Sequence, residues 1–425
     1  EWTGPGERWQ RPAKPSTLSV SPTSEVRHAD LLEIGPEWGL FDYVIAHGLF
    51  SWVPEAVREK ILAIAGEHLA LHGVAYVSDD TYPGGRLREA VPEMMLYHTR
   101  HAPDAATRVR MARGPVEALC EGLSRQDPYR AFLAAVIERI AARPDACLYH
   151  DQLAEIYQPV YFHELVARAE RHGLQYLGEA DFSAVRLPEM PAGAARMLET
   201  ATDDPLVAEQ YRDFLRCRCF RRTLLCRRET PVDRAVAPER LRGLYVASAF
   251  APAQAPHLQP RIPVELHGPR RRKVTSDHPL TKATLAVLAQ YWPAALPFHD
   301  LLREVQGALG QAQADASSLA EVLVQASAAD VVELHAWAAP MAARPGERPQ
   351  ASALARWQAA GGIEVTTLRH TAVRLESDRE RRLLELLDGT RDRGALLREQ
   401  DLAELSAGQL EAALRSLARI GLLVC

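Results

Sequence analysis

The feature that most constrains this chain is a strand, a helix and a second strand that follow one another between residues 41 and 78. Residues 41–46 (FDYVIA) form a short apolar run with β-branched and aromatic side chains, which is typical of a buried strand. Pro54 suits the first turn of the helix that follows. Gly73 ends this helix, and residues 74–78 (VAYVS) predict a second buried strand. The order predicts a βαβ unit of a parallel sheet.

The sheet pattern continues towards residue 230. Residues 87–150 have helical periodicity, and we interpret them as a helical insertion. A helix is expected over residues 160–171 and a further strand over residues 174–177. Residues 220–227 predict a strand at the edge of the sheet. The fold expected for residues 26–230 is therefore α/β, an incomplete Rossmann-like sheet with a helical insertion.

The rest of the chain divides at proline-rich stretches. Residues 1–25 are rich in Pro, Ser, Thr and Gly and are expected to be a disordered or non-native leader. Residues 231–279 contain eight prolines and are expected to be a linker. Residues 280–340 predict three helices and a strand, which is compatible with a winged helix. Residues 350–425 predict a C-terminal α/β domain, so the C-terminal domains are expected to be mainly helical and winged-helix-like.

Composition excludes several classes of protein. The net charge of −5 gives no general affinity for nucleic acid or for anionic membranes, and the short basic run at residues 270–273 is best explained as a solvated face. No apolar run approaches the roughly 20 residues of a membrane span, and no signal-peptide core is present. Six cysteines in 425 residues make no disulfide framework, which predicts a protein of the reducing cytoplasm.

Ligands of an open parallel sheet bind outside the carboxyl ends of its strands, so the residues that follow each strand are the candidates. Residues 47–52 (HGLFSW) follow the first strand, and residues 79–84 (DDTYPG) follow the second. Residues 28–31 (HADL) end what is expected to be an earlier strand.

Four peptides carry a resemblance to a known family: residues 45–54 (IAHGLFSWVP), 81–84 (TYPG), 159–164 (PVYFHE) and 172–180 (HGLQYLGEA). They resemble the class I S-adenosylmethionine (SAM)-dependent methyltransferases that carry a methyltransferase regulatory domain, and the helical insertion at about residues 87–150 would then be regulatory. The better known members of that family are bacterial protein-lysine methyltransferases. The resemblance covers roughly residues 26–425, and it implies SAM as cofactor and lysine amines of a protein as acceptor.

The chain also departs from the family pattern. It lacks the acidic-Gly-x-Gly-x-Gly turn after the first strand and the acidic residue that binds ribose, and Gly4 and Gly6 do not replace them because Pro5 removes a backbone donor. The domain is therefore expected to be N-terminally incomplete, which would weaken SAM binding. Asp79 or Asp80 stands where the family has Asn, and Gly85 where it has Trp.

The resemblance implies roles for individual residues. Asp30 would contact the adenine amino group and Leu31 would offer its backbone amide, while His47 and Gly48 would lie beside the methionine half of SAM. Each has a structural alternative: Asp30 as a solvated loop carboxylate, and His47 as a hydrogen-bonded residue at a strand end.

The acceptor side is predicted from aromatic residues. Phe50, Trp52 and Tyr82 would wall a channel that holds a lysine by cation–π contact, and His163 is the polar candidate at the start of a helix. Phe50 and Trp52 are alternatively core residues. No catalytic residue is assigned, because methyl transfer mainly requires alignment of the reactants and exclusion of water.

No metal site is expected. Cys217 and Cys219 are separated by one residue, which is not a zinc-ligand spacing, and the neighbouring arginines oppose a cation.

Three functions follow from these observations. The first is an enzyme, a SAM-dependent methyltransferase that acts on protein lysine amines. The alternative is a non-catalytic remnant that serves as a protein-binding scaffold, because a sheet without its first strands exposes an edge and an apolar face. A DNA-binding regulator ranks last, because the chain is acidic and residues 318–327 carry no basic side chain.

Overall fold

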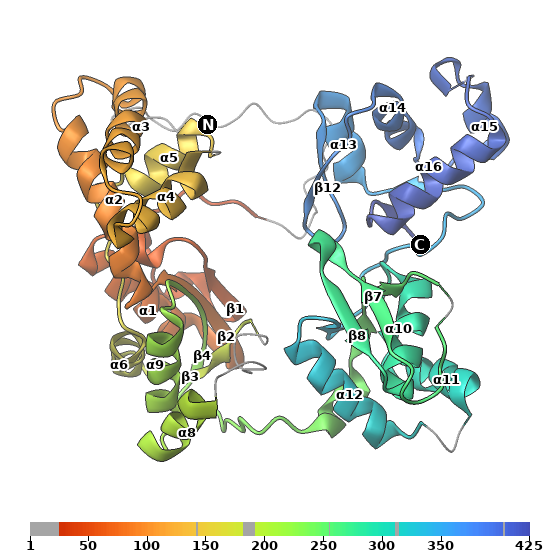
Figure 1. Ribbon diagram of the computed structural model, residues 1–425, viewed down its shortest axis with the longest axis horizontal. Helices are drawn as coiled ribbons and strands as arrows, with labels where there is room; N and C mark the ends of the chain where they lie inside the picture. The colour runs from red at the N-terminus through yellow and green to blue at the C-terminus, as the bar shows by residue number, and fades with distance from the viewer. Residues whose placement is uncertain (1–24, 142, 182–191, 255, 311–313, 403) are drawn as a thin grey trace. The chain divides into compact units, whose positions relative to one another are not determined.

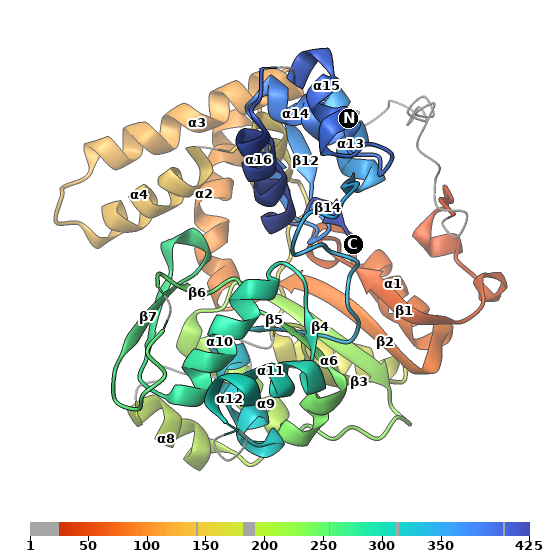
Figure 2. The same cartoon turned by 90° about the vertical axis from the view of Figure 1, so that its right-hand side faces the viewer.

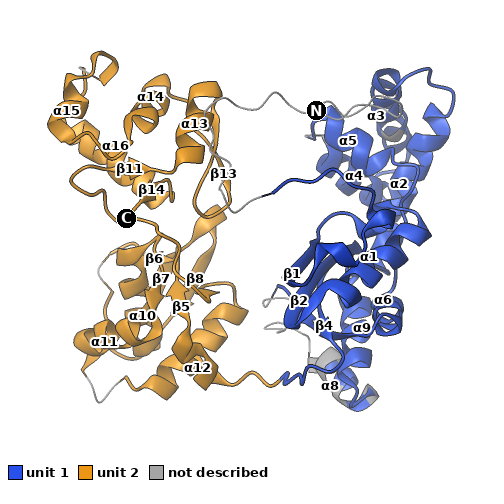
Figure 3. Ribbon diagram, turned by 180° about the vertical axis from the view of Figure 1, so that it is seen from behind, with its two compact units in different colours: residues 1–13, 25–181, 189–234 blue, residues 14–24, 182–188, 235–425 orange. Residues whose placement is uncertain are grey.

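The computed structural model describes residues 25–425 except residues 142, 182–191, 255, 311–313 and 403. The leader expected at residues 1–25 lies almost wholly outside the described residues. The chain forms two compact units, shown in different colours in Figure 3: the first holds residues 25–181 and 189–234, and the second holds residues 235–425.

A four-stranded sheet in the order β1-β2-β4-β3 forms the base of the first unit, and the strands lie next to one another in Figure 2. β1 (Phe41–Ala46) is parallel to β2 (Leu69–Asp80), and α1 (Glu55–His68) connects them. β4 (Phe220–Arg227) is antiparallel to both β2 and β3 (Leu174–Glu179). The predicted βαβ unit is confirmed, although its second strand begins earlier than expected, at Leu69.

The position of β4 differs from the expectation. Residues 220–227 predict a strand at the edge of the sheet, but β4 lies inside the sheet between β2 and β3. The reason is that Arg221, whose side chain has no exposed surface, is neutralised by buried carboxylates on β3 and on a neighbouring helix. A buried charge is tolerated in a central strand when it is paired and hydrogen-bonded.

Helices cover the sheet through a compact apolar core. α1 and α6 (Phe162–Arg171) supply residues such as Leu62 and Leu165, both without exposed surface, to a core with Leu69 and Leu225 of the strands. α6 begins with a capping box between Tyr161 and Glu164. α8 (Ala192–Ala201) and α9 (Pro205–Arg216) follow β3 along the chain.

Four helices form the insertion that was expected at about residues 87–150. They are α2 (Gly84–Thr99), α3 (Ala105–Gly122), α4 (Pro128–Ala141) and α5 (Asp145–Gln152), seen in orange and yellow in Figure 1. Their apolar stripes bury a second core, which includes Met95, Leu133 and Leu148. The insertion therefore has hydrophobic stabilisation of its own.

A linker was expected at residues 231–279, but residues 235–279 belong to the second unit and contribute to a folded domain. They form η4 (Pro238–Gly243), β5 (Tyr245–Ala247), β6 (Ala251–Pro252), β7 (Val264–His267) and β8 (Lys273–Ser276). Leu241, Val246, Phe250 and Leu266 are buried in the core that they share with the following helices. Several prolines are compatible with these elements: Pro238 opens a 3₁₀ turn and Pro252 ends an edge strand.

The following residues complete this domain. Its helices are α10 (Pro279–Tyr291), α11 (Phe298–Leu309) and α12 (Ala316–Ala328), which match the three expected helices closely. β9 (Leu296–Pro297) and β10 (Glu333–His335) flank β5 in a small antiparallel sheet.

The C-terminal part has a separate leucine-rich core. Its helices are α13 (Ala353–Gly361), α14 (Asp378–Leu386), α15 (Arg393–Arg398) and α16 (Ala407–Arg419). Two strand pairs accompany them: β11 (Gln350–Ala351) with β14 (Leu423–Val424), and β12 (Glu364–Thr366) with β13 (Ala372–Arg374). Across the described part of the chain, no helix combines the length and apolarity needed to cross a bilayer.

Candidate functional site

A cavity of about 730 Å³ lies in the first unit where β1 and β2 end. This volume is in the range of small-molecule sites. Its wall comes from the strand ends, from the helical insertion and from the segment between α9 and β4. The lining residues are His47, Trp52, Asp80, Gly84, Leu87, Arg88, Pro92, Phe132, Val136, Arg139, Ile140, Arg143, Asp151, Gln152, Tyr157, Cys217, Cys219 and Phe220.

Asp80 is the buried carboxylate of this cavity, with 3% of its surface exposed. Its backbone N–H donates to Ser51 Oγ at 2.8 Å, and its carbonyl accepts from the Val160 N–H at 3.2 Å. Its side chain pairs with the guanidinium of Arg88. Burial raises the pKa of Asp80, and the Arg88 charge opposes that rise. The backbone hydrogen bonds to Ser51 and Val160 therefore fix the position of the Asp80 carboxylate.

The position of Arg88 depends on the way α2 begins. The Gly84 N–H donates to the Arg218 carbonyl at 2.9 Å, and a Cβ at Gly84 would lie 2.4 Å from the Cys217 carbonyl oxygen. Only glycine permits this close approach of two backbones. At Gly85, where the family pattern has Trp, a Cβ would lie 2.9 Å from Pro159 Cβ, so this chain has no room there for a large side chain.

Aromatic rings form one wall of the cavity. The Trp52 ring lies 4.9 Å from the Tyr157 ring and 5.1 Å from the His150 ring, measured between centroids. The Tyr157 hydroxyl is buried, and it interacts with both Asp80 and Arg88. Burial, followed by the negative charge of Asp80, raises the pKa of Tyr157, so the phenol stays protonated at neutral pH. A buried hydroxyl beside a carboxylate is a favourable place for a polar ligand.

A second ion pair lies at the same cavity. Arg143 pairs with Asp151, and His150 Nδ1 is 2.9 Å from Asp151 Oδ1. Arg139, also on the wall, is exposed. The cavity therefore carries charges of both signs, and each of its two aspartates has an arginine partner.

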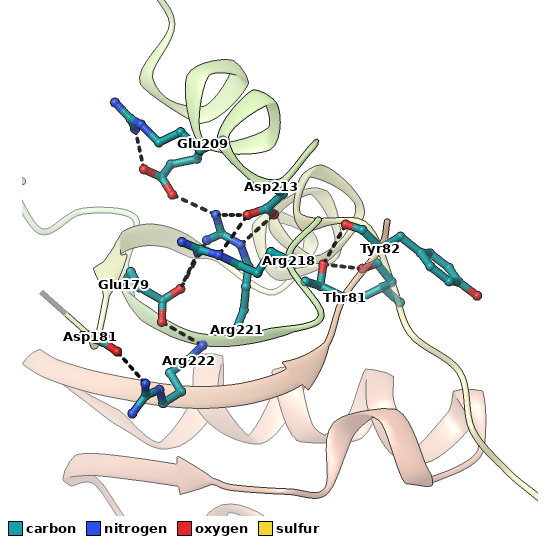
Figure 4. A network of polar contacts seen from close by, with 11 residues as sticks. Thr81, Tyr82, Glu179, Asp181, Glu209, Asp213, Arg218, Arg221 and Arg222 are labelled. Carbon is teal, nitrogen blue, oxygen red and sulfur yellow. Dashed lines mark hydrogen bonds and ion pairs between the residues drawn. The ribbon is translucent and has the colours of Figure 1, made fainter. Parts of the chain in front are cut away.

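A separate buried cluster lies around Arg221 on β4, which we call the Arg221 cluster (Figure 4). Arg221 donates to Asp213 at 2.8 and 3.0 Å and to Glu209 at 2.8 Å, and its Nη1 lies 3.5 Å from Glu179. Its guanidinium lies 4.0 Å from the centre of the Phe162 ring. Burial raises the pKa of Glu179 and Asp213, and the arginine opposes that rise.

Asp79 borders the Arg221 cluster rather than the cavity. It pairs with Arg221 in the β2–β4 register and is 1% exposed. Both of its carboxyl oxygens lack a hydrogen-bond partner among the described residues. Burial raises the pKa of Asp79 well above its ordinary value, which favours the neutral carboxyl. The two aspartates at the end of β2 therefore have different roles, and only Asp80 faces the cavity.

The residues predicted to contact SAM lie in two places. Asp30 is exposed, and its Oδ1 accepts from the Leu32 N–H at 2.9 Å to cap the 3₁₀ turn η1 (Leu31–Glu33). Leu31 packs against the core of the sheet. His47 lines the cavity, and its Nδ1 is 3.0 Å from the Tyr76 hydroxyl. Gly48 has a φ of +64° and donates its N–H to Ser78 Oγ at 2.8 Å.

The residues predicted to wall an acceptor channel are dispersed. Trp52 lines the cavity, whereas Phe50 has no exposed surface and packs in the sheet core. The Tyr82 hydroxyl donates to Glu89 at 2.7 Å, and its ring lies under the Arg86 guanidinium, outside the lining of the cavity. His163 is exposed, with Nδ1 2.9 Å from Gln210 Oε1. The cavity thus brings together His47 and Trp52 of the eight predicted residues.

Sequence reasoning missed the polar groups that the insertion brings to the cavity. Arg143, Asp151 and Tyr157 lie far along the chain from the strand ends, whereas Arg88 is close to the end of β2. Only Arg88 has a usable sequence signal, because it stands one helical turn after Gly84, the last residue of the peptide 79–84 that follows the second predicted strand.

Metal chemistry has no support in the residues described. Among them, no group of three or more His, Cys, Asp and Glu side chains is arranged to hold a metal ion. Cys217 and Cys219 are free thiols at the cavity wall.

Two family models match parts of the chain. Residues 144–227 match the model described as a predicted methyltransferase regulatory domain, and residues 347–414 match the C-terminal winged helix domain of PKMT. The winged helix had been expected at residues 280–340, and the regulatory part at about residues 87–150. Both models therefore match further along the chain than the sequence pattern suggested.

The chain is also similar to curated proteins. An uncharacterized protein of Rickettsia prowazekii, RP789, is 30% identical over 287 residues, which are 66% of this chain and 52% of that protein. The uncharacterized protein sll1526 of Synechocystis is 25% identical over 189 residues, which are 44% of this chain and 37% of that protein. The chain thus spans about half the length of RP789.

Among solved structures, PKMT2 from Rickettsia typhi in complex with AdoHcy matches with a TM-score of 0.79 and 24% identity over 93% of this chain and 83% of that chain. A second structure of PKMT2 has the same TM-score and coverage at 22% identity. The chain has the PKMT2 fold, an α/β domain followed by a winged helix domain. The resemblance to class I methyltransferases with a regulatory domain is confirmed at the level of fold and domain families.

Proposed function

We propose that this protein is a SAM-dependent methyltransferase that methylates lysine amines of a protein acceptor. The observation that carries the proposal is the cavity at the carboxyl ends of two parallel strands, where Asp80 and Tyr157 meet an aromatic wall. The likeness to PKMT2, a protein solved with AdoHcy, supports the choice of cofactor. The regulatory-domain and PKMT winged-helix matches support the reaction class.

The residues of this chain fit one side of such a cofactor. The cavity of about 730 Å³ has room for a small molecule beside His47, and Gly48 with its positive φ lets the backbone turn there without a side chain in the way. Asp30 has an exposed carboxylate at the start of η1. His47, Gly48 and Asp30 would hold the cofactor, which supplies an electrophilic methyl group when bound.

Side chains of the protein would position the acceptor amine. Asp80 accepts hydrogen bonds from the acceptor amine and so fixes the direction of its lone pair. The Trp52 ring packs against the alkyl chain, and α2 and α5 shield the amine from water. The amine attacks in its neutral form, so the lysine ammonium first loses a proton to solvent, and positioning of the neutral amine then supplies most of the effect.

We propose a protein rather than a nucleic acid as acceptor, and the cytoplasm as its location. The net charge of −5 supports the first point, because a nucleic-acid site is usually basic. Free cysteines at the cavity support the second, because a reducing compartment preserves them.

One observation favours the scaffold alternative. Phe41, Tyr43 and Ile45 alternate along β1, so they share one face, and they are 42%, 72% and 70% exposed. β1 pairs only with β2 among the described strands. An apolar face and an open strand edge are features of a surface that binds another protein.

Two measurements test the proposal. Calorimetry with SAM and with AdoHcy should detect binding to the full chain, and radiolabelled methyl groups should pass to lysine residues of a protein mixture. Acid hydrolysis of the labelled proteins should release methyl-lysines. If the folded protein shows neither a heat of binding nor transfer of labelled methyl groups, the proposal of an enzyme is overturned and the scaffold alternative is favoured.

A further inference from the structure

The pairing of Asp80 with Arg88 is the feature that the proposed function does not use. It joins a carboxylate at a strand end to a guanidinium on the helical insertion. The side chain of Asp80 is 4% exposed and that of Arg88 is 39% exposed. The two charges therefore stand in unequal surroundings, although they form one ion pair.

This inequality determines which partner can leave. An unpaired carboxylate at the Asp80 position would be strongly destabilised, because it is removed from water. Arg88 reaches the pair from a half-open surface, so its guanidinium regains hydration when it turns away. Another cation can therefore replace Arg88, whereas Asp80 must stay in the pair.

The surroundings of Asp80 suit a particular cation. The Tyr157 hydroxyl, buried beside Asp80, can accept a hydrogen bond from an N–H donor. The Trp52 ring packs on Tyr157 and offers an aromatic face to an alkylammonium group. A carboxylate, a phenol oxygen and an indole ring together match a primary ammonium on an alkyl chain.

We propose that Asp80 is the counter-ion of a primary alkylammonium group on the acceptor, and that Arg88 holds this place in the free protein, so that the acceptor binds by exchange with the Arg88 guanidinium. The identity of the acceptor rests on the proposed function. The exchange itself can be observed without methyl transfer. Arg88 is then a specificity-determining residue, because a neutral or anionic group cannot take its place.

The fixed position of Asp80 supports this exchange. Ser51 and Val160 hold the Asp80 backbone from two other segments, so the carboxylate stays in place when Arg88 leaves. Asp151 lies close enough to add to the negative field at Asp80, but it has its own partner in Arg143. Arg88 is therefore the cation that must leave before another cation can pair with Asp80.

The test uses the full chain and n-butylammonium as probe, with n-butanol and butyrate as comparisons. Binding is measured by calorimetry at about pH 9, where an alkylammonium ion still carries its proton. Arg88→Met removes the competing cation and should tighten butylammonium binding by about tenfold or more, because the binding-competent state becomes the main one. Butanol and butyrate should show no tightening.

Two further variants complete the design. Asp80→Asn in the Arg88→Met background should abolish the gain. Arg86→Met is the matched control, since Arg86 lies in the same turn of α2, pairs with Glu89 and does not line the cavity. Its binding of butylammonium should equal that of the wild type. If Arg88→Met does not fold, Arg88→Lys replaces it and should give a smaller tightening, because a lysine grips a carboxylate with fewer donors.

The outcomes separate this inference from the proposed function. Unchanged butylammonium binding in folded Arg88→Met, or a gain that survives Asp80→Asn, would overturn the exchange. Tighter binding of butyrate than of butylammonium would do the same. Cation exchange without SAM binding or methyl transfer would leave the inference standing and refute the enzyme, and methyl transfer without exchange would do the reverse.

Discussion

Replacement of Arg221 by leucine should destabilise the first unit strongly. The side chain is fully buried, and it donates to Asp213 and Glu209 while facing Glu179 (Figure 4). Arg221→Leu removes the main cation that faces three buried carboxylates. Arg218 still contacts two of them, Glu179 and Asp213. Breaking one side of a buried ion pair costs roughly 3–5 kcal/mol in unfolding free energy. For a unit of this size the Tm should fall by roughly 6–20 °C.

The assay is thermal and urea unfolding of the full chain, followed by circular dichroism, with Arg222→Leu as the matched control. Arg222 is the next residue of β4, but its side chain is 44% exposed and pairs with Asp181 at the surface. Such a pair contributes about 0–1 kcal/mol. Arg221→Leu should also recover stability as the pH falls, because unpaired buried carboxylates have raised pKa values and the folded state then binds more protons than the unfolded state.

A double variant separates charge from packing. Arg221→Leu with Asp213→Leu should be more stable than Arg221→Leu alone, since it removes one of the buried carboxylates that lost the Arg221 guanidinium. The reasoning is refuted if Arg221→Leu loses no more stability than Arg222→Leu, or if its deficit does not shrink on acidification.

Two other outcomes follow from single contacts. Gly84→Ala places a Cβ 2.4 Å from a backbone oxygen, so it should lower the free energy of urea unfolding by about 1–3 kcal/mol. Gly114→Ala in α3 is the control and should not destabilise the protein, because nothing lies within 4 Å of that position. Equal effects of the two substitutions would contradict the close approach at Gly84. Hydrogen bonds from Thr390, with help from Arg391, lower the pKa of Asp388 from 3.8 to about 2. Because the folded pKa is depressed, this stabilisation is present above pH 3.8 and is lost as the pH falls towards 2, so Asp388→Asn should be less stable than wild type at neutral pH but not near pH 2. An NMR titration of the carboxyl that gives an ordinary pKa would refute this.

The sequence allowed the βαβ unit and most helices to be predicted, because their apolar residues recur with a clear period. Residues 231–279 were misjudged as a linker, since proline content says nothing about Val246 or Phe250 packing against helices further along the chain. Residues 220–227 predict an edge strand, whereas β4 lies inside the sheet. Its burial depends on carboxylates of β3 and α9, which only the tertiary fold brings together.

The candidate site was predictable only in part, for a similar reason. The strand-end rule directed attention to His47 and to the pair Asp79 and Asp80, of which His47 and Asp80 line the cavity. It could not say which aspartate faces the cavity, because alternate side chains of a strand point to opposite faces and the register decides which is which. Tyr157 arrives through a turn after α5, and its sequence surroundings carry no periodic signal.

The contact between Thr81 and Val160 has a consequence for the evolution of this protein. These two residues form a parallel bridge, and Thr81 Oγ1 donates to the Val160 carbonyl at 2.8 Å, so the chain leaves the sheet and returns to it at one point. Everything from α2 to α5 is therefore an excursion whose two ends are tied together at the base. Such a module can be lengthened, shortened or exchanged with little entropic penalty. Related chains could acquire new acceptors by replacing the module while the strand ends beneath it remain as they are.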